Sequence, residues 1–218
     1  MWMNGKGGAA GGRLLVMLLA LLVSGSLLAA PAARAKGPAG PVLVVGDSLS
    51  AEHNIPRGSG WVSLLQQRLA RDSGRSVVNA SISGETSAGA LTRLPALLTK
   101  HKPSLVVIEL GGNDALRGLA PAQLASNLGR MVQLSQQSGA RVLLLGIDVP
   151  PNYGPAYRER LRRTYQDLAK AEGVALVPFF LEGVALEQGM MQGDGLHPTA
   201  AAQPRLLENV WPQLKPLL

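Results

Sequence analysis

The chain has 218 residues, no cysteine and a formal net charge of +7 at pH 7. Without cysteine it cannot be a disulfide-stabilised scaffold, and it cannot carry a lipid anchor on a cysteine. The modest charge and an aromatic content of 4% argue against nucleic-acid binding, which favours a broad basic surface interleaved with aromatic side chains.

The first 35 residues have the layout of a secretory signal peptide. Lys6 and Arg13 precede an almost wholly apolar run over residues 14–30, and Ala33-Arg34-Ala35 matches the small-x-small pattern of a cleavage site. A retained membrane anchor is the alternative, but an apolar run of about 17 residues is at the short limit for a transmembrane helix. We therefore expect residues 1–35 to be removed and the mature protein to be periplasmic or secreted, with no stable membrane anchor.

The mature chain, residues 36–218, has the length of a single domain. It keeps 18 basic residues against 14 acidic ones, which is a small positive excess. We expect a monomer that binds no nucleic acid.

Short apolar runs alternate along this chain with segments whose apolar residues recur at helical spacing. The predicted strands are Val42–Val45, Ser76–Asn79, Leu105–Leu110, Arg141–Ile147 and Val174–Val177. The predicted helices are Trp61–Arg71, Ala88–Thr99, Pro121–Ser138, Tyr157–Ala171 and a closing helix over Thr199–Leu217, interrupted by Pro204 and Pro212. This alternation predicts an α/β fold in which helices cover both faces of a parallel sheet.

Loops rich in small and polar residues follow the first three predicted strands. Ser48 comes directly after the first strand in Gly46-Asp47-Ser48-Leu49, Gly84 lies in the second loop, and Asn113 lies in the third. Because such loops emerge at one edge of a parallel sheet, we expect these residues to converge. The backbone amides of Ser48 and Gly84 and the side-chain amide of Asn113 would then form an oxyanion hole.

A second motif far downstream, Asp194-Gly195-Leu196-His197-Pro198, supplies the groups that would activate a serine. An Asp and a His three residues apart can come from one short loop and complete a Ser–His–Asp relay. Ser48 would be the nucleophile, His197 the general base, and Asp194 the carboxylate that orients the imidazole. The predicted chemistry is acyl transfer to water, although no G-x-S-x-G elbow surrounds Ser48.

Two other histidines compete for the role of base. His101 lies in a polar helix end and is predicted to be a surface residue. His53 is close to Ser48 in sequence but has no placed carboxylate partner, so it is expected not to be the base, and contact with substrate stays open.

The acidic residues show no spacing typical of metal ligands, so we expect no metal site. Asp47 and Asp114, which neighbour functional positions, are predicted to hold their loops through hydrogen bonds to backbone amides.

Three segments offer candidates for a substrate pocket. Met190 and Met191 precede the Asp–His loop and either line an acyl pocket or belong to the core. Tyr153 lies in a proline-rich segment over residues 148–154, which is either the rim of that pocket or a rigid connection. The basic run over residues 158–163 reads as a solvated helix face in which Glu159 pairs with a following arginine, with contact to an anionic substrate as the alternative.

The four blocks around Ser48, Gly84, Asn113 and Asp194–His197, in this order, resemble those of the SGNH (GDSL) hydrolases. Further similarity to the secreted bacterial thioesterase I/protease I/lysophospholipase type, also called arylesterase, lies in Val78–Gly84, Arg93–Leu98, Pro151–Gly154 and Pro178–Phe180. The resemblance implies a flavodoxin-like three-layer α/β/α sandwich with a five-stranded parallel sheet, a Ser–Asp–His triad, no cofactor, and an acyl ester or thioester as substrate. The stretch Ser50–Asn54 departs from this type, which more often has small residues followed by Tyr or Phe.

Two other functions stay open at this point. The SGNH superfamily also includes carbohydrate acetylesterases, and a non-catalytic periplasmic binding domain could be built on the same sheet. The aliphatic segments near the predicted site argue against the first alternative. A binding domain, the second alternative, would not need an Asp-x-x-His loop that faces an exposed serine.

Overall fold

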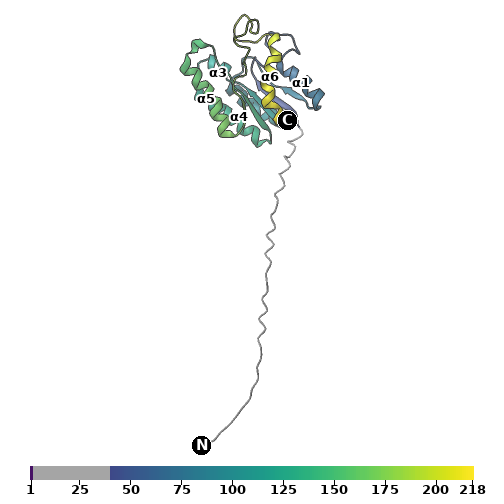
Figure 1. The fold of residues 1–218 in the computed structure, drawn as a ribbon, viewed down its shortest axis with the longest axis vertical. Coiled ribbons are helices and arrows are strands. Elements are labelled where there is room, and N and C mark those ends of the chain that lie inside the picture. Colours follow the sequence, from purple (N-terminus) through teal and green to yellow (C-terminus); the bar gives the residue numbers. More distant parts are fainter. Residues whose placement is uncertain (2–39) are drawn as a thin grey trace. The chain divides into compact units, whose positions relative to one another are not determined.

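Five short apolar segments form one sheet in the computed structural model, which describes Met1 and residues 40–218 (Figure 1). The strands are β1 (Val42–Gly46), β2 (Val77–Asn79), β3 (Leu105–Glu109), β4 (Arg141–Leu145) and β5 (Ala175–Val177). Their order is β2-β1-β3-β4-β5 and every neighbouring pair is parallel, which confirms the predicted parallel sheet and its flavodoxin-like order. Each observed strand lies within two residues of its predicted bounds.

Helices cover both faces of this sheet. They are α1 (Trp61–Asp72), α2 (Ser87–His101), α3 (Gly112–Leu116), α4 (Pro121–Gln137), α5 (Pro155–Glu172) and α6 (Gln203–Leu214), with 3₁₀ turns η1 (Pro151–Tyr153), η2 (Ala200–Ala202) and η3 (Lys215–Leu217). Helices α1 and α6 pack together on one side, and α4 packs between α2 and α5 on the other (Figure 1). This arrangement is the three-layer sandwich that the alternating pattern predicted.

The closing helix differs from its prediction in detail. Pro204 stands at the second position of α6 and therefore begins the helix instead of interrupting it, because a residue there has no intrahelical partner for an N–H. Pro212 does lie inside α6. The ends of the predicted segment are the 3₁₀ turns η2 and η3.

The centre of the sheet is buried on both sides. Every residue of β1 and β3 is buried, which explains why these strands read as continuous apolar runs rather than alternating ones. Each fully buried Val or Leu contributes about 1.5–3 kcal/mol relative to an exposed one. The single charged residue in these two strands is Glu109, the last residue of β3.

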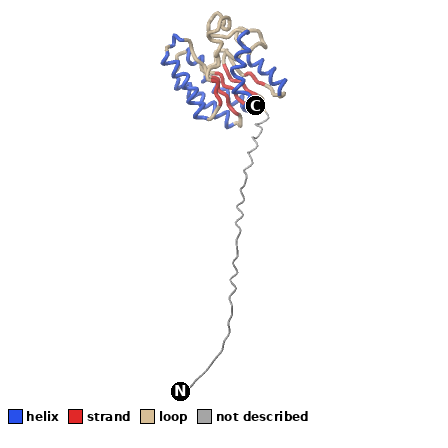
Figure 2. The backbone as a smooth tube through the Cα atoms, in the orientation of Figure 1, coloured by secondary structure: helices blue, strands red, loops and turns tan. Residues whose placement is uncertain are grey.

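The loops at the carboxyl ends of the strands gather at one end of the sheet, opposite the C-terminus of the chain (Figure 2). The chain leaves β1 toward β2 on one side and later returns to β3 on the other, so β1 lies at the point where the strand order reverses. In open α/β sheets ligands bind just beyond such a point. Ser48 lies two residues beyond the end of β1.

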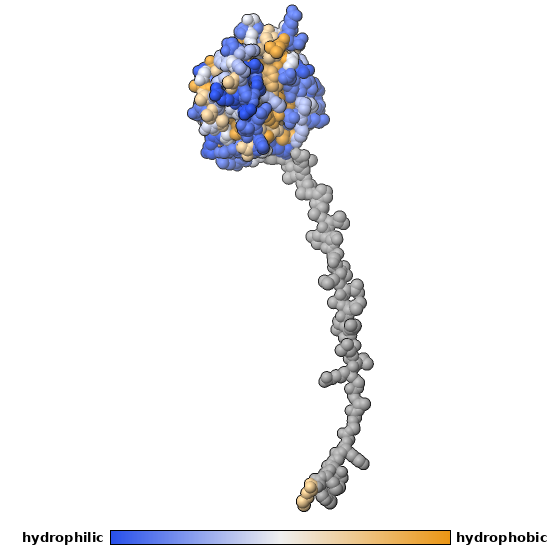
Figure 3. All heavy atoms as spheres, turned by 60° about the vertical axis from the view of Figure 1, so that its left-hand side comes forward, coloured by the Kyte–Doolittle hydropathy of each residue, from blue (hydrophilic) through white to orange (hydrophobic). Residues whose placement is uncertain are grey.

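Residues 40–218 all fall within one compact unit, and hydrophilic residues cover most of the face shown in Figure 3. Among these residues no helix is long and apolar enough to cross a membrane. The predicted signal peptide, residues 1–35, lies outside the described part of the chain apart from Met1.

Candidate active site

Ser48 and His197, 149 positions apart in the chain, are in hydrogen-bonding contact. His197 Nε2 lies 2.9 Å from Ser48 Oγ, and His197 Nδ1 lies 2.7 Å from Asp194 Oδ2. In the tautomer that fits both contacts, Nδ1 donates to the carboxylate and Nε2 accepts from the hydroxyl. The imidazole thus bridges the serine and the carboxylate in the order that a Ser–His–Asp relay requires.

Asp194 is held so that its carboxylate stays ionised. The ring of His197 donates to Oδ2, and the backbone amides of Leu196 and His197 donate to Oδ1 at 2.9 and 3.0 Å. These bonds favour the ionised carboxylate and hold the pKa of Asp194 well below its usual range; the bond from the His197 ring has the largest effect. The turn needs glycine at position 195, where φ is +66°.

Asp47 fixes the loop that carries Ser48. Its Oδ1 accepts from the amide of Leu49 at 3.0 Å, and its Oδ2 accepts from Asn113 Nδ2 at 3.0 Å. Asp114 similarly accepts from the amide of Ser87 at 2.9 Å, so both aspartates hold loops, as predicted. Asp47 therefore ties the Ser48 loop directly to the loop after β3.

Asn113 faces a cavity that Ser48 and His197 also line. Its side-chain amide carries two N–H donors, and Asp47 engages only one of them. The preceding Gly111 has φ +123°, and a Cβ there would lie 2.1 Å from the hydroxyl of Tyr165. Only glycine therefore lets the chain turn from β3 into the short helix α3, which carries Asn113.

Gly84 is in a different situation. It is exposed and is not among the residues that line the two cavities described below, and its carbonyl accepts from Arg117 Nη2 at 3.1 Å. A Cβ at position 84 would meet no atom within 4 Å, so close approach is not what requires glycine in the described structure. The requirement comes from the backbone, whose φ is +79°.

A fully buried carboxyl group lies beneath the Ser48 loop, which the sequence reasoning missed. Glu109 Oε2 accepts from Ser50 Oγ at 2.8 Å and from the amide of Asp47 at 3.3 Å, while Oε1 has no partner. Burial, reinforced by the charge of Asp47, raises the pKa of Glu109 well above its usual range. Burial likewise raises the pKa of Asp47 to about 6. The signal in the sequence was one glutamate at the end of an apolar strand.

These raised pKa values make folding stability fall as the pH rises. The folded protein holds protons that the unfolded chain releases. The stabilisation is therefore complete at low pH and is lost as pH rises through the raised folded pKa values of Glu109 and Asp47, the latter near 6. We expect Glu109→Gln to flatten this dependence, because glutamine stays neutral. Urea unfolding between pH 5 and 9 measures it, with the exposed Glu187→Gln as control. If the free energy of unfolding changes equally with pH in Glu109→Gln and in the unmodified protein, Glu109 is not a buried acid that stays protonated in the folded state.

Two adjoining cavities open at this site. The first, of about 90 Å³, is lined by Ser48, Asn113 and His197 among others. The second, of about 300 Å³, shares five lining residues with the first: Asp148, Val149, Pro150, Leu181 and Leu196. Met191 lines the second cavity and also packs against the core, so both alternatives that the sequence left open describe part of its surroundings. Met190 and Tyr153 line neither of the two.

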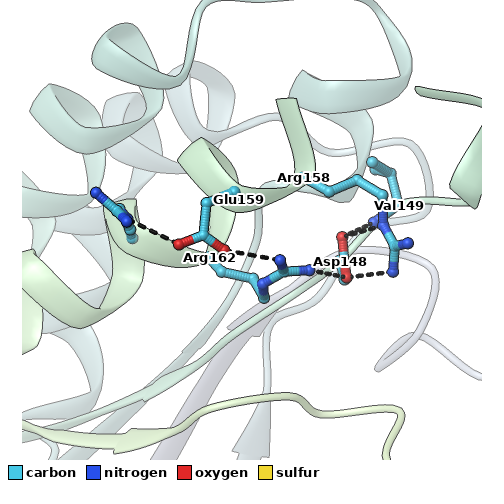
Figure 4. Close-up of polar contacts among 6 residues, drawn as sticks. Asp148, Val149, Arg158, Glu159 and Arg162 are labelled. Atoms are coloured by element: carbon cyan, nitrogen blue, oxygen red, sulfur yellow. Dashed lines mark hydrogen bonds and ion pairs between the residues drawn. The ribbon is translucent and has the colours of Figure 1, made fainter. Parts of the chain in front are cut away.

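Asp148, which lines both cavities, belongs to a cluster of charged side chains (Figure 4). Asp148 accepts from Arg158 Nε and Nη2 at 3.1 and 2.6 Å and from Arg162 Nη1 at 3.1 Å. Burial alone would raise the pKa of Asp148, but the hydrogen bonds from Arg158, Val149 and Arg162 and the arginine charges lower it. Glu159 pairs with both Arg162 and Arg163, in line with the predicted helix face, but Arg158 lines the second cavity.

Within residues 40–218 no group of three or more His, Cys, Asp or Glu side chains is placed to hold a metal ion. The residues around Ser48 are instead hydrogen-bond donors and acceptors with an apolar surround. They suit proton transfer and stabilisation of an anion.

Comparison with known proteins agrees with this geometry. Esterase TesA of Pseudomonas aeruginosa is 63% identical over 201 residues, which cover 91% of this chain and 99% of that protein. Thioesterase 1/protease 1/lysophospholipase L1 of Escherichia coli K12 is 45% identical over 177 residues, covering 81% and 84%. The crystal structure of the psychrotrophic esterase EstA from Pseudoalteromonas sp., inhibited by monoethylphosphonate, has 40% identity and a TM-score of 0.77, covering 81% and 97%.

The family model of the GDSL-like Lipase/Acylhydrolase family matches residues 44–204, a span that holds all four sequence blocks. The resemblance drawn from those blocks is therefore confirmed, and so is the expectation of an enzyme that hydrolyses ester bonds. The chain belongs to the GDSL-like lipase/acylhydrolase family.

Proposed function

We propose that this esterase works by covalent catalysis, with Ser48 as nucleophile, His197 as general base and acid, and Asp194 as the residue that orients the imidazole. The observation that carries the proposal is the position of His197, within 2.9 Å of Ser48 Oγ and 2.7 Å of Asp194 Oδ2. Both contacts are within the range of hydrogen bonds that transfer or hold a proton.

The reaction proceeds in two halves. His197 Nε2 takes the proton of Ser48 as Oγ attacks the ester carbonyl, and the tetrahedral oxyanion is met by the amide of Ser48 and the free N–H of Asn113, with the amide of Gly84 as the third proposed donor. The protonated imidazole then gives its proton to the departing alcohol or thiol, which leaves an acyl-serine. Water, deprotonated by His197, attacks that acyl group. The bond to Ser48 Oγ then breaks, the imidazolium returns its proton to Oγ, and the acid is released.

The substrates we propose are carboxylic esters with short to medium acyl chains and thioesters of the same acids. The related proteins named above are an esterase and a thioesterase/lysophospholipase, which supports both classes. The acyl chain would run from the small cavity at Ser48 into the larger one, along the apolar side chains of Leu181, Leu196 and Met191. Apolar pockets discriminate weakly among neighbouring chain lengths, by about 1–3 kcal/mol per methylene.

An assay of residues 36–218 on p-nitrophenyl esters of graded length, an acyl-CoA and an acetylated sugar tests this proposal. We expect turnover of the esters, with kcat/KM rising from acetyl to medium chains as the second cavity is filled. A preference for the acetylated sugar would instead support a carbohydrate acetylesterase. Absence of turnover on every substrate would contradict catalysis and leave a binding domain.

We further propose that the protein is exported and that cleavage after Ala35 releases it into the periplasm or the medium. The charged start, the apolar run and the Ala-x-Ala site support this. Intact-mass analysis of periplasmic protein should find Lys36 as the first residue. Protein that keeps Met1 and fractionates with membranes would contradict the proposal.

A further inference from the structure

His53 packs against the proposed catalytic base. The ring centroids of His53 and His197 are 4.2 Å apart, and the ring planes are inclined by 36°. His53 lines neither of the two cavities at Ser48, whereas His197 lines the smaller one. The two rings are neighbours, but of the two only His197 reaches the cavity at Ser48.

The backbone around His53 is held in an unusual conformation. Glu52 and Asn54, the residues on either side, both have positive φ, at 58° and 53°. Left-handed backbone is uncommon for glutamate and costs about 1–3 kcal/mol, so the surrounding structure must enforce it. Glu52 is fixed by the amides of Gly58 and Gly60, at 3.1 and 2.9 Å, and by the hydroxyl of Ser63 at 2.7 Å.

The carbonyl of His53 is also tied to the loop that carries His197. Gln192 Nε2 donates to the His53 carbonyl at 3.0 Å and to the Pro198 carbonyl at 2.9 Å. One side-chain amide thus fastens the Ser48 loop to the catalytic loop. On its other side the His53 ring meets the amide of Asn54, with Nε2 and Nδ2 3.1 Å apart.

We infer that His53 is a positioning residue. Gln192 anchors its backbone and Asn54 contacts its ring, and this ring holds the imidazole of His197 in line between Ser48 and Asp194. The inference rests on the proposed role of His197 as base. A ring packed against His197 limits rotation of the imidazole, which otherwise would move Nε2 away from Ser48 Oγ. Small misplacements matter, since about 1 Å can cost roughly 100-fold in rate.

Alignment of the imidazole matters most in the transition state, when Nε2 takes the proton of Ser48 Oγ. It does not change how the substrate is held in the ground state. His53 therefore affects kcat and leaves KM nearly unchanged.

The test compares His53→Ala, which removes the ring, with His53→Phe, which keeps a neutral ring of similar size. We expect His53→Ala to lower kcat about 10-fold with little change in KM, and His53→Phe to recover most of the loss. The low-field proton NMR signal of the His197 Nδ1–H, which bonds Asp194, should broaden in His53→Ala and return in His53→Phe. His101→Ala, at the far helix end, is the matched histidine control.

The two proposals fail in different ways. If His197→Ala keeps wild-type activity, the proposed function is wrong, whatever His53 does. If His197→Ala is inactive while His53→Ala has wild-type kcat and an unchanged Nδ1–H signal, only the inference about His53 is overturned. The inference about His53 is also overturned if His53→Phe loses as much kcat as His53→Ala while the thermal midpoints show that both proteins are folded. The aromatic ring would then not be the part of His53 that positions His197.

Discussion

Replacing Ser48 or His197 by alanine is expected to lower kcat by about 10⁴- to 10⁶-fold, the largest effect of any substitution in this chain. Ser48→Ala removes the atom that forms the acyl-enzyme. His197→Ala leaves the hydroxyl of Ser48 without a base, because the ring nitrogen 2.9 Å from it is lost. Steady-state rates on a p-nitrophenyl ester measure both.

The two losses are not expected to add. Serine and base act as one unit, so the double variant should be about as slow as either single one, with residual activity from the oxyanion hole and substrate binding. Asp194→Ala should be milder, since the imidazole remains, although less well oriented. His101→Ala serves as the control and should keep full activity. If His53→Ala is as inactive as His197→Ala, the assignment of His197 as the base is wrong.

Asn113→Ala is expected to give the second-largest effect, a fall in kcat of about 10²- to 10³-fold with KM little changed. Asn113 lines the cavity at Ser48, and Asp47 engages only one of the two N–H groups of its side-chain amide. Such a donor works mainly on the oxyanion of the transition state, so its loss appears in kcat. Measuring kcat, KM and the thermal midpoint of this variant separates a catalytic from a structural asparagine.

Asn127 provides the matched control. It is a buried asparagine on α4 whose Nδ2 donates to Ser87 Oγ at 2.8 Å, away from the cavities at Ser48. Asn127→Ala should lower the thermal midpoint and leave kcat of the folded protein near normal. If Asn113→Ala behaves in that same way, Asn113 does not belong to the oxyanion hole and only the backbone donors remain.

The fold could be predicted from the sequence because its central strands, β1, β3 and β4, are buried on both faces. Runs such as Val42–Val45 are apolar throughout, without the alternating polar residues of a strand that is exposed on one face. Glycine or proline marks ends of the neighbouring helices. The five-residue helix α3 was not predicted, since one turn leaves too little periodicity to recognise. Pro204 was misjudged because the sequence does not show whether a proline begins a helix or interrupts it.

The juxtaposition of Ser48 with His197 and Asp194 was predictable for a different reason. The topology of a parallel sheet brings loops at the carboxyl ends of strands to one edge, so polar residues after β1 and in a late loop were expected to meet. The contact of Asn113 with Asp47 follows the same logic.

The surroundings of these residues were not predictable, because they depend on contacts between side chains that no local pattern encodes. Glu109 belongs to an apolar strand, and only the structure reveals that its carboxyl group lies under the Ser48 loop. His53 was set aside for want of a carboxylate partner, whereas its neighbour is the ring of His197. Arg158 reads as one of several surface arginines, yet it lines the second cavity.

The central claim, that Ser48 forms a covalent acyl-enzyme with the help of His197, is tested most directly by labelling with an ethyl p-nitrophenyl phosphonate and peptide mass spectrometry. Attack by Ser48 Oγ on phosphorus would release p-nitrophenolate and leave the ethyl phosphonate on the serine. We expect one adduct per chain, on Ser48, with esterase activity lost in proportion and labelling slowed in His197→Ala. Labelling of Ser48→Ala at the wild-type rate, or full activity in completely labelled protein, would contradict the account.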